Sequence, residues 1–580
     1  MPTTSQDLDT VLTQLEAAKS SFDAGHAAHI AALLNKLSRV EFKDPHHLIR
    51  FHESVLFLRA FPHAASLIPR VDRLLNSFHR RVENLRALGA DMSPFDDFDT
   101  SGISGTAMQD TLSFDVAQWL ARRIPHHVDI AWHDYWEDYQ AERGRATTWP
   151  RFISLLEEDA DVEANIPWWR WIDAARGRQR ALQWLLNQFA QLPLSGRERS
   201  ELYDSLRIPI RWTLENLKLS RTRNRIRPRR FYVHNGPLIQ RSEVSLAHEL
   251  SQPAPKFEKL SLTAGEKVMH AIREVMVVRY RELHGTTLGD SRSVVRFDLG
   301  RGVVIHFWGL PADRRLPLRA YFAGYTLKNG VPINYIEAIG LCEWIEVGFN
   351  TFYTYRQGET AWIYAQALRC LRALTAAKCI SIYPYQIGQN NDEAIDSGAF
   401  WFYRKLGFRP GRSDLQALCE REEKRIAANL RYRTPPRTLK RLAEAHMFYD
   451  TAKSDAVRAP ATARGAWDTF STRNLGLLVN RRMAREFSGD SGKMRQACTA
   501  GMIRVLNINS SNWTSDQRRA LENWSLVLAQ IPDLADWTVE EKHELVKIIR
   551  AKSATNEMRY LRETQQHARL RSELLRLGSQ

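Results

Sequence analysis

The sequence predicts a multidomain α+β protein, in which a central mixed or antiparallel sheet with packed helices is flanked by mainly α-helical N- and C-terminal regions. Apolar residues recur with helical spacing over residues 6–90 and 107–220, and helical spacing returns after residue 413. Between these regions, residues 302–355 contain runs of β-branched and aromatic residues, which are typical of strands. A chain of 580 residues has room for about three to five domains.

The composition excludes several classes of protein. Hydrophobic residues make up 44% and charged residues 26% of the chain, a balance that favours globular domains over disorder. No apolar run approaches the ~20 residues of a membrane-spanning helix. The polar N-terminus lacks the basic and apolar segments of a signal peptide. We therefore expect a cytoplasmic protein with no membrane partner.

Residues 1–250 are predicted to form a helical N-terminal region, with a possible split at residues 93–106. The split is predicted because that segment is rich in Asp, Ser and Gly, which favours a loop. Tryptophans are frequent between residues 119 and 212. We expect most of them to fill the core between helices.

The cysteine and histidine patterns predict no metal site. The 5 cysteines are scattered and form no C-x-x-C pair, which argues against a disulfide framework and a thiolate zinc site. Asp129, His133 and Glu137 have the spacing of one helical face. Such residues can bind a divalent ion. We interpret this face instead as solvated and self-paired.

Residues 251–256 are predicted to be a linker, because they contain two prolines and little that would pack. Residues 257–412 then form the predicted α/β domain. Its first helix is expected to open at Thr263 and Glu266, which have capping-box spacing, and to stop near Gly285.

The strands and later helices of this domain follow in order along the chain. Strands are predicted at residues 302–310, 318–327 and 334–355. The dipeptide Asn329-Gly330 lies between the second and third of these and is a strong hairpin signal. A helix over 359–374, a short buried strand over 379–385 and a helix over 394–406, ended by Gly407, complete the domain.

Residues 413–580 are predicted to form a basic helical C-terminal region, with breaks near 434–436 and at 486–492. This region carries a net charge of +9, and residues 218–230 carry seven cations and no acid, so these two segments account for the whole net charge of +16. Basicity that is concentrated in this way predicts a docking surface for an anionic partner.

The short basic segment is a candidate polyanion-binding site. Its arginines stand at alternate positions and end in a pair: Arg221, Arg223, Arg225, Arg227, Arg229 and Arg230. In an extended chain, alternate side chains line one face roughly 6–7 Å apart, which is similar to phosphate spacing along a nucleic-acid strand. Guanidinium groups also suit phosphate. The alternative is an arm that clasps acidic residues elsewhere in the chain.

A motif late in the α/β domain carries a family resemblance. Residues 399–410 read AFWFYRKLGFRP, in which Ala399 on a helix leads to Tyr403 and then to Leu406-Gly407-Phe408. A helix, a hairpin, a long strand, a turn that opens a helix and a short strand precede it. Over residues 266–410 this motif and this order resemble the GCN5-related N-acetyltransferase (GNAT) superfamily. The resemblance implies an acyltransferase that moves an acyl group from acetyl-CoA, or another acyl-CoA, to an amine acceptor of unidentified class.

The resemblance also implies catalytic roles. Tyr403 would be the general acid that protonates the departing thiolate. Glu346 would be the base, because the superfamily often carries its base on this strand. Period-two alternation places Glu346 with Gly348 and Asn350 on one face of the strand. Asn391 lies near the position at which the superfamily has an asparagine before that tyrosine.

The superfamily's cofactor loop is matched by YTYRQGETAW, residues 353–362, in two registers. In one register Arg356 and Ala361 are the outer positions and Glu359 takes the glycine position. In the other, Gly358 is the loop glycine. A turn that opens a helix suits a pyrophosphate, because free N–H groups and the positive end of the helix dipole converge there. Glu359 would repel phosphate unless its side chain points away.

These considerations give one set of candidate cofactor-binding residues: Arg356, Gln357, Gly358, Glu359, Thr360, Ala361 and Asn391. Two alternatives of other kinds stay open. The domain could be a catalytically degenerate scaffold or a nucleic-acid-associated protein. It could also be an acyl- or aminoacyl-transferase that uses a donor other than coenzyme A.

Overall fold

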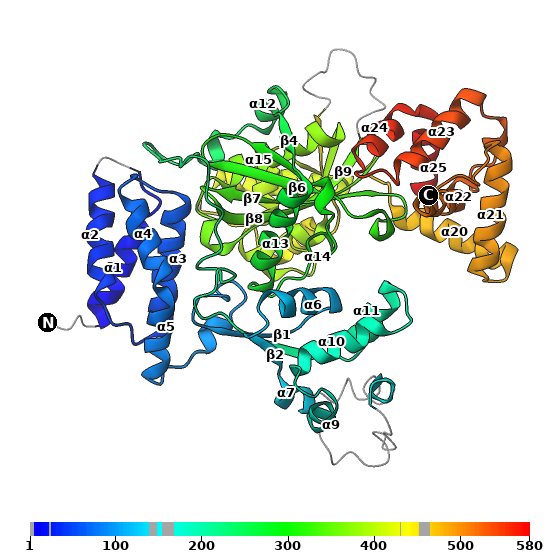
Figure 1. Ribbon diagram of the computed structural model, residues 1–580. Coiled ribbons are helices and arrows are strands. Elements are labelled where there is room, and N and C mark those ends of the chain that lie inside the picture. The colour runs from blue at the N-terminus through cyan, green and yellow to red at the C-terminus, as the bar shows by residue number, and fades with distance from the viewer. Residues whose placement is uncertain are drawn as a thin grey trace. The chain divides into compact units, whose positions relative to one another are not determined.

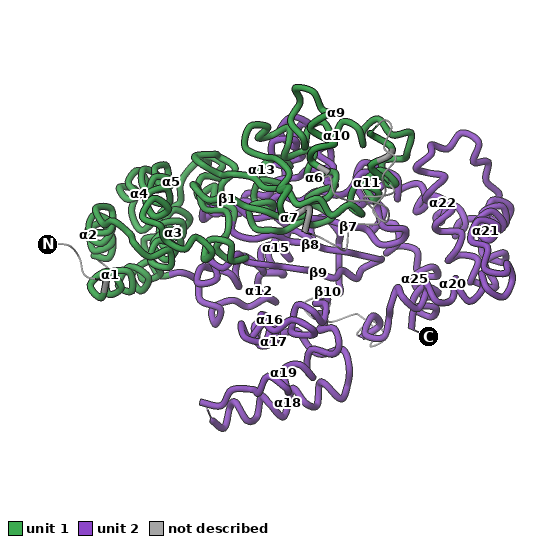
Figure 2. The backbone as a smooth tube through the Cα atoms, turned by 90° about the horizontal axis from the view of Figure 1, so that it is seen from below, with its two compact units in different colours: residues 1–237, 269–287, 329–332 green, residues 238–268, 288–328, 333–580 purple. Residues whose placement is uncertain are grey.

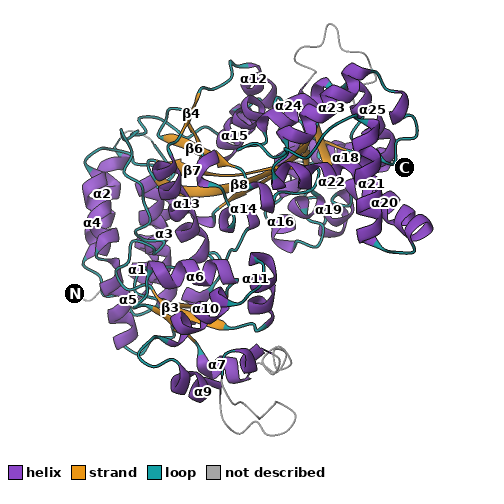
Figure 3. Cartoon of the chain, turned by 45° about the vertical axis from the view of Figure 1, so that its right-hand side comes forward, coloured by secondary structure: helices purple, strands orange, loops and turns teal. Residues whose placement is uncertain are grey.

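The computed structural model describes residues 5–22, 25–137, 148–153, 168–429, 431–451 and 465–579 (Figure 1). The chain forms two compact units (Figure 2). Unit 1 comprises residues 1–237, 269–287 and 329–332, and unit 2 comprises residues 238–268, 288–328 and 333–580. Both units contain helices and a sheet (Figure 3), so the chain is an α+β protein with antiparallel and mixed sheets.

Unit 1 begins with a helical bundle: α1 (Ser5–Ala18), α2 (His26–Ser38), α3 (Pro45–Ala60), α4 (Leu67–Asn76) and α5 (Phe78–Ala87). Helix α3 is buried along most of its length, including Phe51, Val55 and Leu58. It starts sharply because the Asp44 carboxylate accepts the amide of His46 at 3.1 Å.

A small antiparallel sheet follows the bundle in unit 1, with the order β1 (Ala107–Thr111), β3 (Pro209–Thr213) and β2 (Val128–Ile130). The other elements are α6 (Phe114–Arg123), α7 (Trp132–Glu137), α9 (Trp168–Ala175), α10 (Ala181–Gln191) and α11 (Gly196–Ser205). Trp149 and Trp212 are fully buried in the core of this part, as expected for the tryptophan-rich segment.

Two predictions for this part are wrong. Residues 107–220 were expected to be helical, but they include three strands, which have only 5, 3 and 5 residues and are too short to stand out by alternation. Asp129 lies on β2 and His133 on α7, so the two do not share a helical face. Among the described residues, no group of three or more His, Cys, Asp or Glu side chains could hold a metal ion.

Unit 2 contains one large sheet. In the described residues its strand order is β11-β12-β10-β9-β8-β7-β6-β5-β4. Strands β9 and β10 are parallel, while the pairs β4–β5, β5–β6, β6–β7, β8–β9, β10–β12 and β11–β12 are antiparallel. The bounds are β4 (Phe257–Lys259), β5 (Val295–Asp298), β6 (Val303–Trp308), β7 (Ala320–Lys328), β8 (Val331–Leu341), β9 (Trp344–Thr351), β10 (Cys379–Ile382), β11 (Arg409–Pro410) and β12 (Met447–Asp450).

The order along one edge departs from the order in the chain. Of the strands in the described residues, β12 comes last in the sequence but lies between β10 and β11. Two helices, α18 (Ser413–Ala428) and α19 (Pro436–Leu442), are inserted between β11 and β12. The other helices of this part are α12 (Leu246–Ser251), α15 (Thr360–Thr375), α16 (Asp392–Asp396) and α17 (Ala399–Lys405).

Several predicted boundaries in this region hold within a few residues. The predicted helix over 359–374 is α15, and the hairpin signal Asn329-Gly330 joins β7 to β8. The predicted long strand over 334–355 is wrong, because Cys342 adopts a φ of 51° and breaks the run into β8 and β9.

Helix α13 (Leu262–Val277) differs from the prediction at both ends. It begins before Thr263, and the amide of Ala264 donates to the hydroxyl of Ser261 at 3.4 Å. Gly285 does not end the helix but lies in the short helix α14 (His284–Thr287).

The C-terminal part of unit 2 is helical: α20 (Thr472–Phe487), α21 (Ser491–Val505), α22 (Ser515–Leu528), α23 (Val539–Ala551), α24 (Met558–Gln566) and α25 (Ala568–Gly578). The predicted breaks near 434–436 and 486–492 coincide with helix ends. No helix in the described residues is long and apolar enough to cross a membrane.

Candidate acid–base site between two parallel strands

The parallel strands β9 and β10 pair over only a short length. Trp344, Ile345 and Glu346 pair with residues 379–381, and β9 then continues to Thr351 without β10 beside it. The carboxyl end of β9 leads to the loop before α15, and that of β10 leads to a 3₁₀ turn at Pro384–Ile387. Ligands commonly bind at the carboxyl ends of parallel strands, so this end of the pair is a candidate site.

Glu346 and His446 form a hydrogen-bonded pair at the last paired position. His446 Nε2 lies 2.9 Å from Glu346 Oε2, and Arg319 Nη1 lies 3.7 Å from the other oxygen, Oε1. The side chains of Glu346 and His446 are 15% and 33% exposed, so solvent or a ligand can reach them. A carboxylate that contacts an imidazole orients the ring, and an imidazole can act as a general base. The pair is therefore a candidate for acid–base chemistry.

Sequence reasoning found Glu346 but missed His446. The two residues are 100 positions apart, and His446 reaches Glu346 because it stands just before β12, which is inserted beside β10. No local pattern marks a lone histidine between a helix and a strand. Only the strand order brings it to the site.

Tyr403 contacts the end of the β9–β10 pair through one other side chain. Its hydroxyl lies 3.5 Å from Gln386 Oε1, which also lies 3.4 Å from the amide of Phe349 on β9. The Tyr403 ring is buried against Tyr364 and Phe408. This burial raises the pKa of the Tyr403 hydroxyl well above its ordinary value. Tyr403 is thus a core residue whose hydroxyl contacts the side chain that lies against β9.

Exposed aromatic side chains border the same end of the strands, and sequence reasoning missed them. Tyr353 follows β9, while Tyr383 and Tyr385 follow β10, and they are 52%, 48% and 53% exposed. The Tyr383 ring meets His446 edge-on with a centroid separation of 5.4 Å. Exposed large aromatic side chains are candidates for ligand contact.

The predicted cofactor loop does lie between β9 and a helix. Arg356 and Gln357 are exposed, and Arg356 forms an ion pair with Glu393. The amide of Gly358 donates to the carbonyl of Tyr355 at 2.9 Å. Helix α15 begins at Thr360, whose hydroxyl donates to the carbonyl of Arg356 at 3.3 Å, and Ala361 is buried.

Glu359 was predicted to bind a cofactor, but its side chain has protein partners instead. It is fully buried, its Oε2 lies 3.0 Å from Lys328 Nζ, and its Oε1 forms an ion pair with Arg301. The amide of Ile239 also donates to Oε1 at 3.3 Å. Burial lowers the pKa of Lys328 to about 8. The carboxylate therefore points into the protein and anchors the start of α15.

Asn391 also has a local structural role. It caps α16, since its Oδ1 accepts the amide of Ala394 at 3.2 Å and its Nδ2 donates to the carbonyl of Tyr385 at 3.0 Å. Both ends of the amide are thus used within the turn that follows β10.

The arginines of the basic segment do not line one extended face. Residues 221–223 form a turn, and Arg221 is buried in an ion pair with Glu53. Arg223 Nη1 donates to the Asn216 side chain at 2.7 Å, and Arg225 donates to the Asn76 side chain at 3.0 Å. The remaining members of the segment are exposed: Arg227, Arg229 and Arg230. Half of the predicted polyanion site thus holds unit 1 together.

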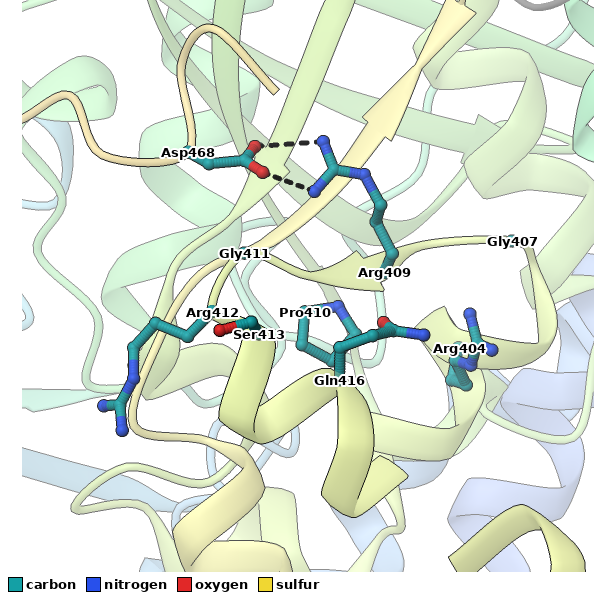
Figure 4. Close-up of a pocket in the computed structure, with 9 residues that line it drawn as sticks. All are labelled: Arg404, Gly407, Arg409, Pro410, Gly411, Arg412, Ser413, Gln416 and Asp468. Atoms are coloured by element: carbon teal, nitrogen blue, oxygen red, sulfur yellow. Dashed lines mark hydrogen bonds and ion pairs between the residues drawn. The ribbon is translucent and has the colours of Figure 1, made fainter. Parts of the chain in front are cut away.

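A pocket of about 500 Å³ lies at the base of the α18–α19 insertion (Figure 4). Its lining contains three arginines, and each has an acidic partner within unit 2: Arg404 with Glu423, Arg409 with Asp468 and Arg412 with Asp414. Figure 4 shows Arg409 facing Asp468 while the Arg412 guanidinium points away. The lining is therefore polar and charge-compensated, and it contains none of the predicted site residues.

Comparisons of the chain with protein-family models, curated proteins and solved structures found no significant match.

Proposed function

We propose that unit 2 is an N-acyltransferase of the GNAT type, which moves an acyl group from a coenzyme A thioester to an amine. The observation that carries this proposal is the Glu346–His446 pair beside the place where the parallel strands β9 and β10 part. The paired carboxylate and imidazole, the end of the β9–β10 pairing and the loop that leads from β9 to α15 then follow one another along β9. The late tyrosine helix α17 also carries the motif on which the family resemblance rests.

The start of α15 fits the pyrophosphate of the donor. An acidic residue at this turn would oppose phosphate, but the carboxylate of Glu359 is buried and paired with Lys328 and Arg301. Its charge is therefore compensated, and it does not face the exposed side of the loop. The exposed residues there, Arg356 and Gln357, present a cation and an amide.

The proposed mechanism needs two proton transfers. The thioester supplies an acyl carbon that is activated toward amines. His446, oriented by Glu346, would take the proton of the attacking amine at a ring nitrogen. As the carbon–nitrogen bond forms and the carbon–sulfur bond breaks, Tyr403, whose hydroxyl contacts Gln386, would give its proton to the departing sulfur. The tyrosinate would then regain a proton from solvent, and His446 would release the amine proton to solvent.

The test measures the affinity for acyl-CoA thioesters and the rate of acyl transfer. Titration calorimetry with acetyl-CoA and longer acyl-CoA thioesters should give a saturable isotherm. Thiol release in the presence of polyamines, lysine peptides or amino sugars should then identify the acceptor. His446→Gln and Tyr403→Phe should lower turnover by roughly 10²–10⁴-fold and leave thioester affinity unchanged. The matched control is His543→Gln, which replaces an exposed histidine on α23.

Other outcomes decide among the alternatives. Full activity of Tyr403→Phe would make Tyr403 a core residue only. A protein that binds no acyl-CoA but transfers from another acyl or aminoacyl donor would indicate a different donor. A protein that binds no donor at all would contradict the proposal and favour a degenerate scaffold.

A further inference from the structure

The α18–α19 hairpin is an insertion at the edge of the large sheet. Helix α18 contacts β11 at its start, and α19 contacts α16. In Figure 2 the two helices extend away from the rest of unit 2. Few side chains of α18 are buried, namely Leu415, Cys419 and Glu422. Most of this hairpin is thus surface and adds little to the core of unit 2.

The charges of the hairpin are unevenly paired. Residues 413–445 contain eight basic and five acidic side chains. All five acids have partners in unit 2: Asp414 and Glu444 with Arg412, Glu422 with Arg425 and Tyr432, Glu423 with Arg404, and Glu420 with Gln416. By contrast, five exposed cations have no ion pair within the described residues: Arg421, Lys424, Arg431, Arg437 and Arg441.

These unpaired cations give the hairpin a positive surface. Four of the five are arginines, whose planar donors match phosphate. No large apolar side chain is exposed in the described part of residues 413–445, so nothing there could insert into a lipid bilayer. The surface is therefore suited to the phosphates of a nucleic acid rather than to a membrane.

Aromatic side chains next to the hairpin favour a single strand. Lys440 on α19 forms an ion pair with Asp392 on α16 at 2.7 Å, and α16 packs on the turn that carries Tyr385. Exposed aromatic rings beside a basic surface are the usual platform for unpaired bases. We propose that the α18–α19 hairpin binds the phosphates of single-stranded nucleic acid without reading base sequence, with Tyr385 stacking on a base. This inference does not depend on acyl transfer.

The test is fluorescence anisotropy of the full chain with a labelled 20-nucleotide thymidine strand over a salt series. Arg421, Lys424, Arg437 and Arg441 are replaced together by Ala. The matched control replaces Arg473, Arg481, Lys493 and Arg504, exposed cations of α20 and α21, and removes the same charge. The slope of log affinity against log salt should fall by about 0.7 for each lost phosphate contact in the hairpin variant. Tyr385→Ala should weaken binding roughly 5-fold or more.

Thermal melts should show that both variants keep the wild-type midpoint, because only exposed side chains are changed. An equal loss in the control variant would mean that net charge alone drives binding, and would overturn the proposal. Absence of binding at 50 mM salt, or binding to phosphatidylserine vesicles without binding to the oligonucleotide, would also overturn it. Tighter binding to a duplex of the same length would contradict the single-strand assignment.

Discussion

At the scale of single residues, the buried charges of unit 2 show what holds the candidate site in place. Glu359 lies where the resemblance expects a glycine, yet it is fully buried between Lys328 and Arg301. Burying charges is costly unless they are paired, and breaking such a pair is costlier still. The ion pairs of Glu359 with Lys328 and Arg301 therefore hold the turn that precedes α15 in place. Glu359 positions the loop and does not contact a ligand itself.

His306 should make the free energy of unfolding depend on pH. It lies on β6, is buried, stacks on Tyr325 with a centroid separation of 5.3 Å and is paired in register with Arg296. Burial lowers its pKa to about 3 in the folded protein, against about 6.5 when unfolded. Between these values the unfolded chain binds more protons. The free energy of unfolding should therefore fall as pH decreases from about 6.5 toward 3, by up to about 1.4 kcal/mol per pH unit.

The measurement is the urea midpoint of unfolding at several pH values between 7 and 4. His306→Phe keeps a flat ring and removes the titrating group, so its midpoint should depend less on pH than that of the wild type. His133→Ala is the control, because the His133 side chain is 83% exposed. Equal pH dependence in the wild type and His306→Phe would contradict the prediction.

Among the secondary-structure elements, the β7–β8 turn shows that a dipeptide, Asn329-Gly330, can determine where a hairpin forms. Asn329 and Gly330 both have positive φ, 49° and 79°, which is the geometry that an Asn-Gly hairpin favours. The turn also contacts the basic segment within unit 1, since the amide of Ile226 donates to the carbonyl of Gly330 at 2.9 Å. Part of the basic segment therefore packs against the β7–β8 turn and has a structural role.

Gly330→Ala should destabilise the protein for two reasons. Alanine is strained at positive φ, and its Cβ would lie only 1.8 Å from the Ile226 carbonyl oxygen. We expect the free energy of unfolding to fall by roughly 2–5 kcal/mol. Gly300→Ala is the matched control, because Gly300 has a φ of 72° but no atom within 4 Å of the new Cβ. It should cost only the strain, roughly 1–2 kcal/mol. Chemical denaturation is the measurement. If both variants lost the same free energy of unfolding, the Ile226 carbonyl could not lie as close to Gly330 as the structure shows.

At the scale of the whole molecule, the C-terminal helices are part of unit 2 rather than an appendage. Trp467 stacks on Trp344 of β9 with a centroid separation of 5.5 Å. The buried Glu343 carboxylate accepts the indole N–H of Trp467 at 2.8 Å and the Nε–H of Arg571 at 2.6 Å. These contacts cover the amino-terminal end of β9.

Removal of residues 465–580 should therefore unfold or weaken the sheet. It would leave the carboxylate of Glu343 buried without its cation and would expose Trp344. Loss of one partner of a buried pair costs about 3–5 kcal/mol, which corresponds to a fall in melting temperature of roughly 10 °C or more. Differential scanning calorimetry of the shortened and full chains is the measurement. An unchanged melting temperature of the sheet would show that residues 465–580 form an independent domain.

Local sequence patterns were enough to predict the type of an element where the signal is strong. Helix α15, helix α18 and the β7–β8 turn were predicted within a few residues, because amphipathic spacing and Asn-Gly chemistry act over a few positions. The sequence also predicted Glu346 on a strand of the central sheet. Short strands such as β3 were wrongly predicted as parts of helices, because they contain too few alternating residues to be recognised.

Contacts between residues far apart in the chain could not be predicted from local patterns. The insertion of β12 beside β10 brings His446 to Glu346, and the sheet brings Lys328 and Arg301 to Glu359. The fold also determines which cations pair with acidic residues inside the protein and which stay exposed. Arg221 pairs with Glu53, whereas Arg437 is exposed. The physical reason is that pairing and burial depend on strand order and packing between segments far apart in the chain, which local spacing does not encode.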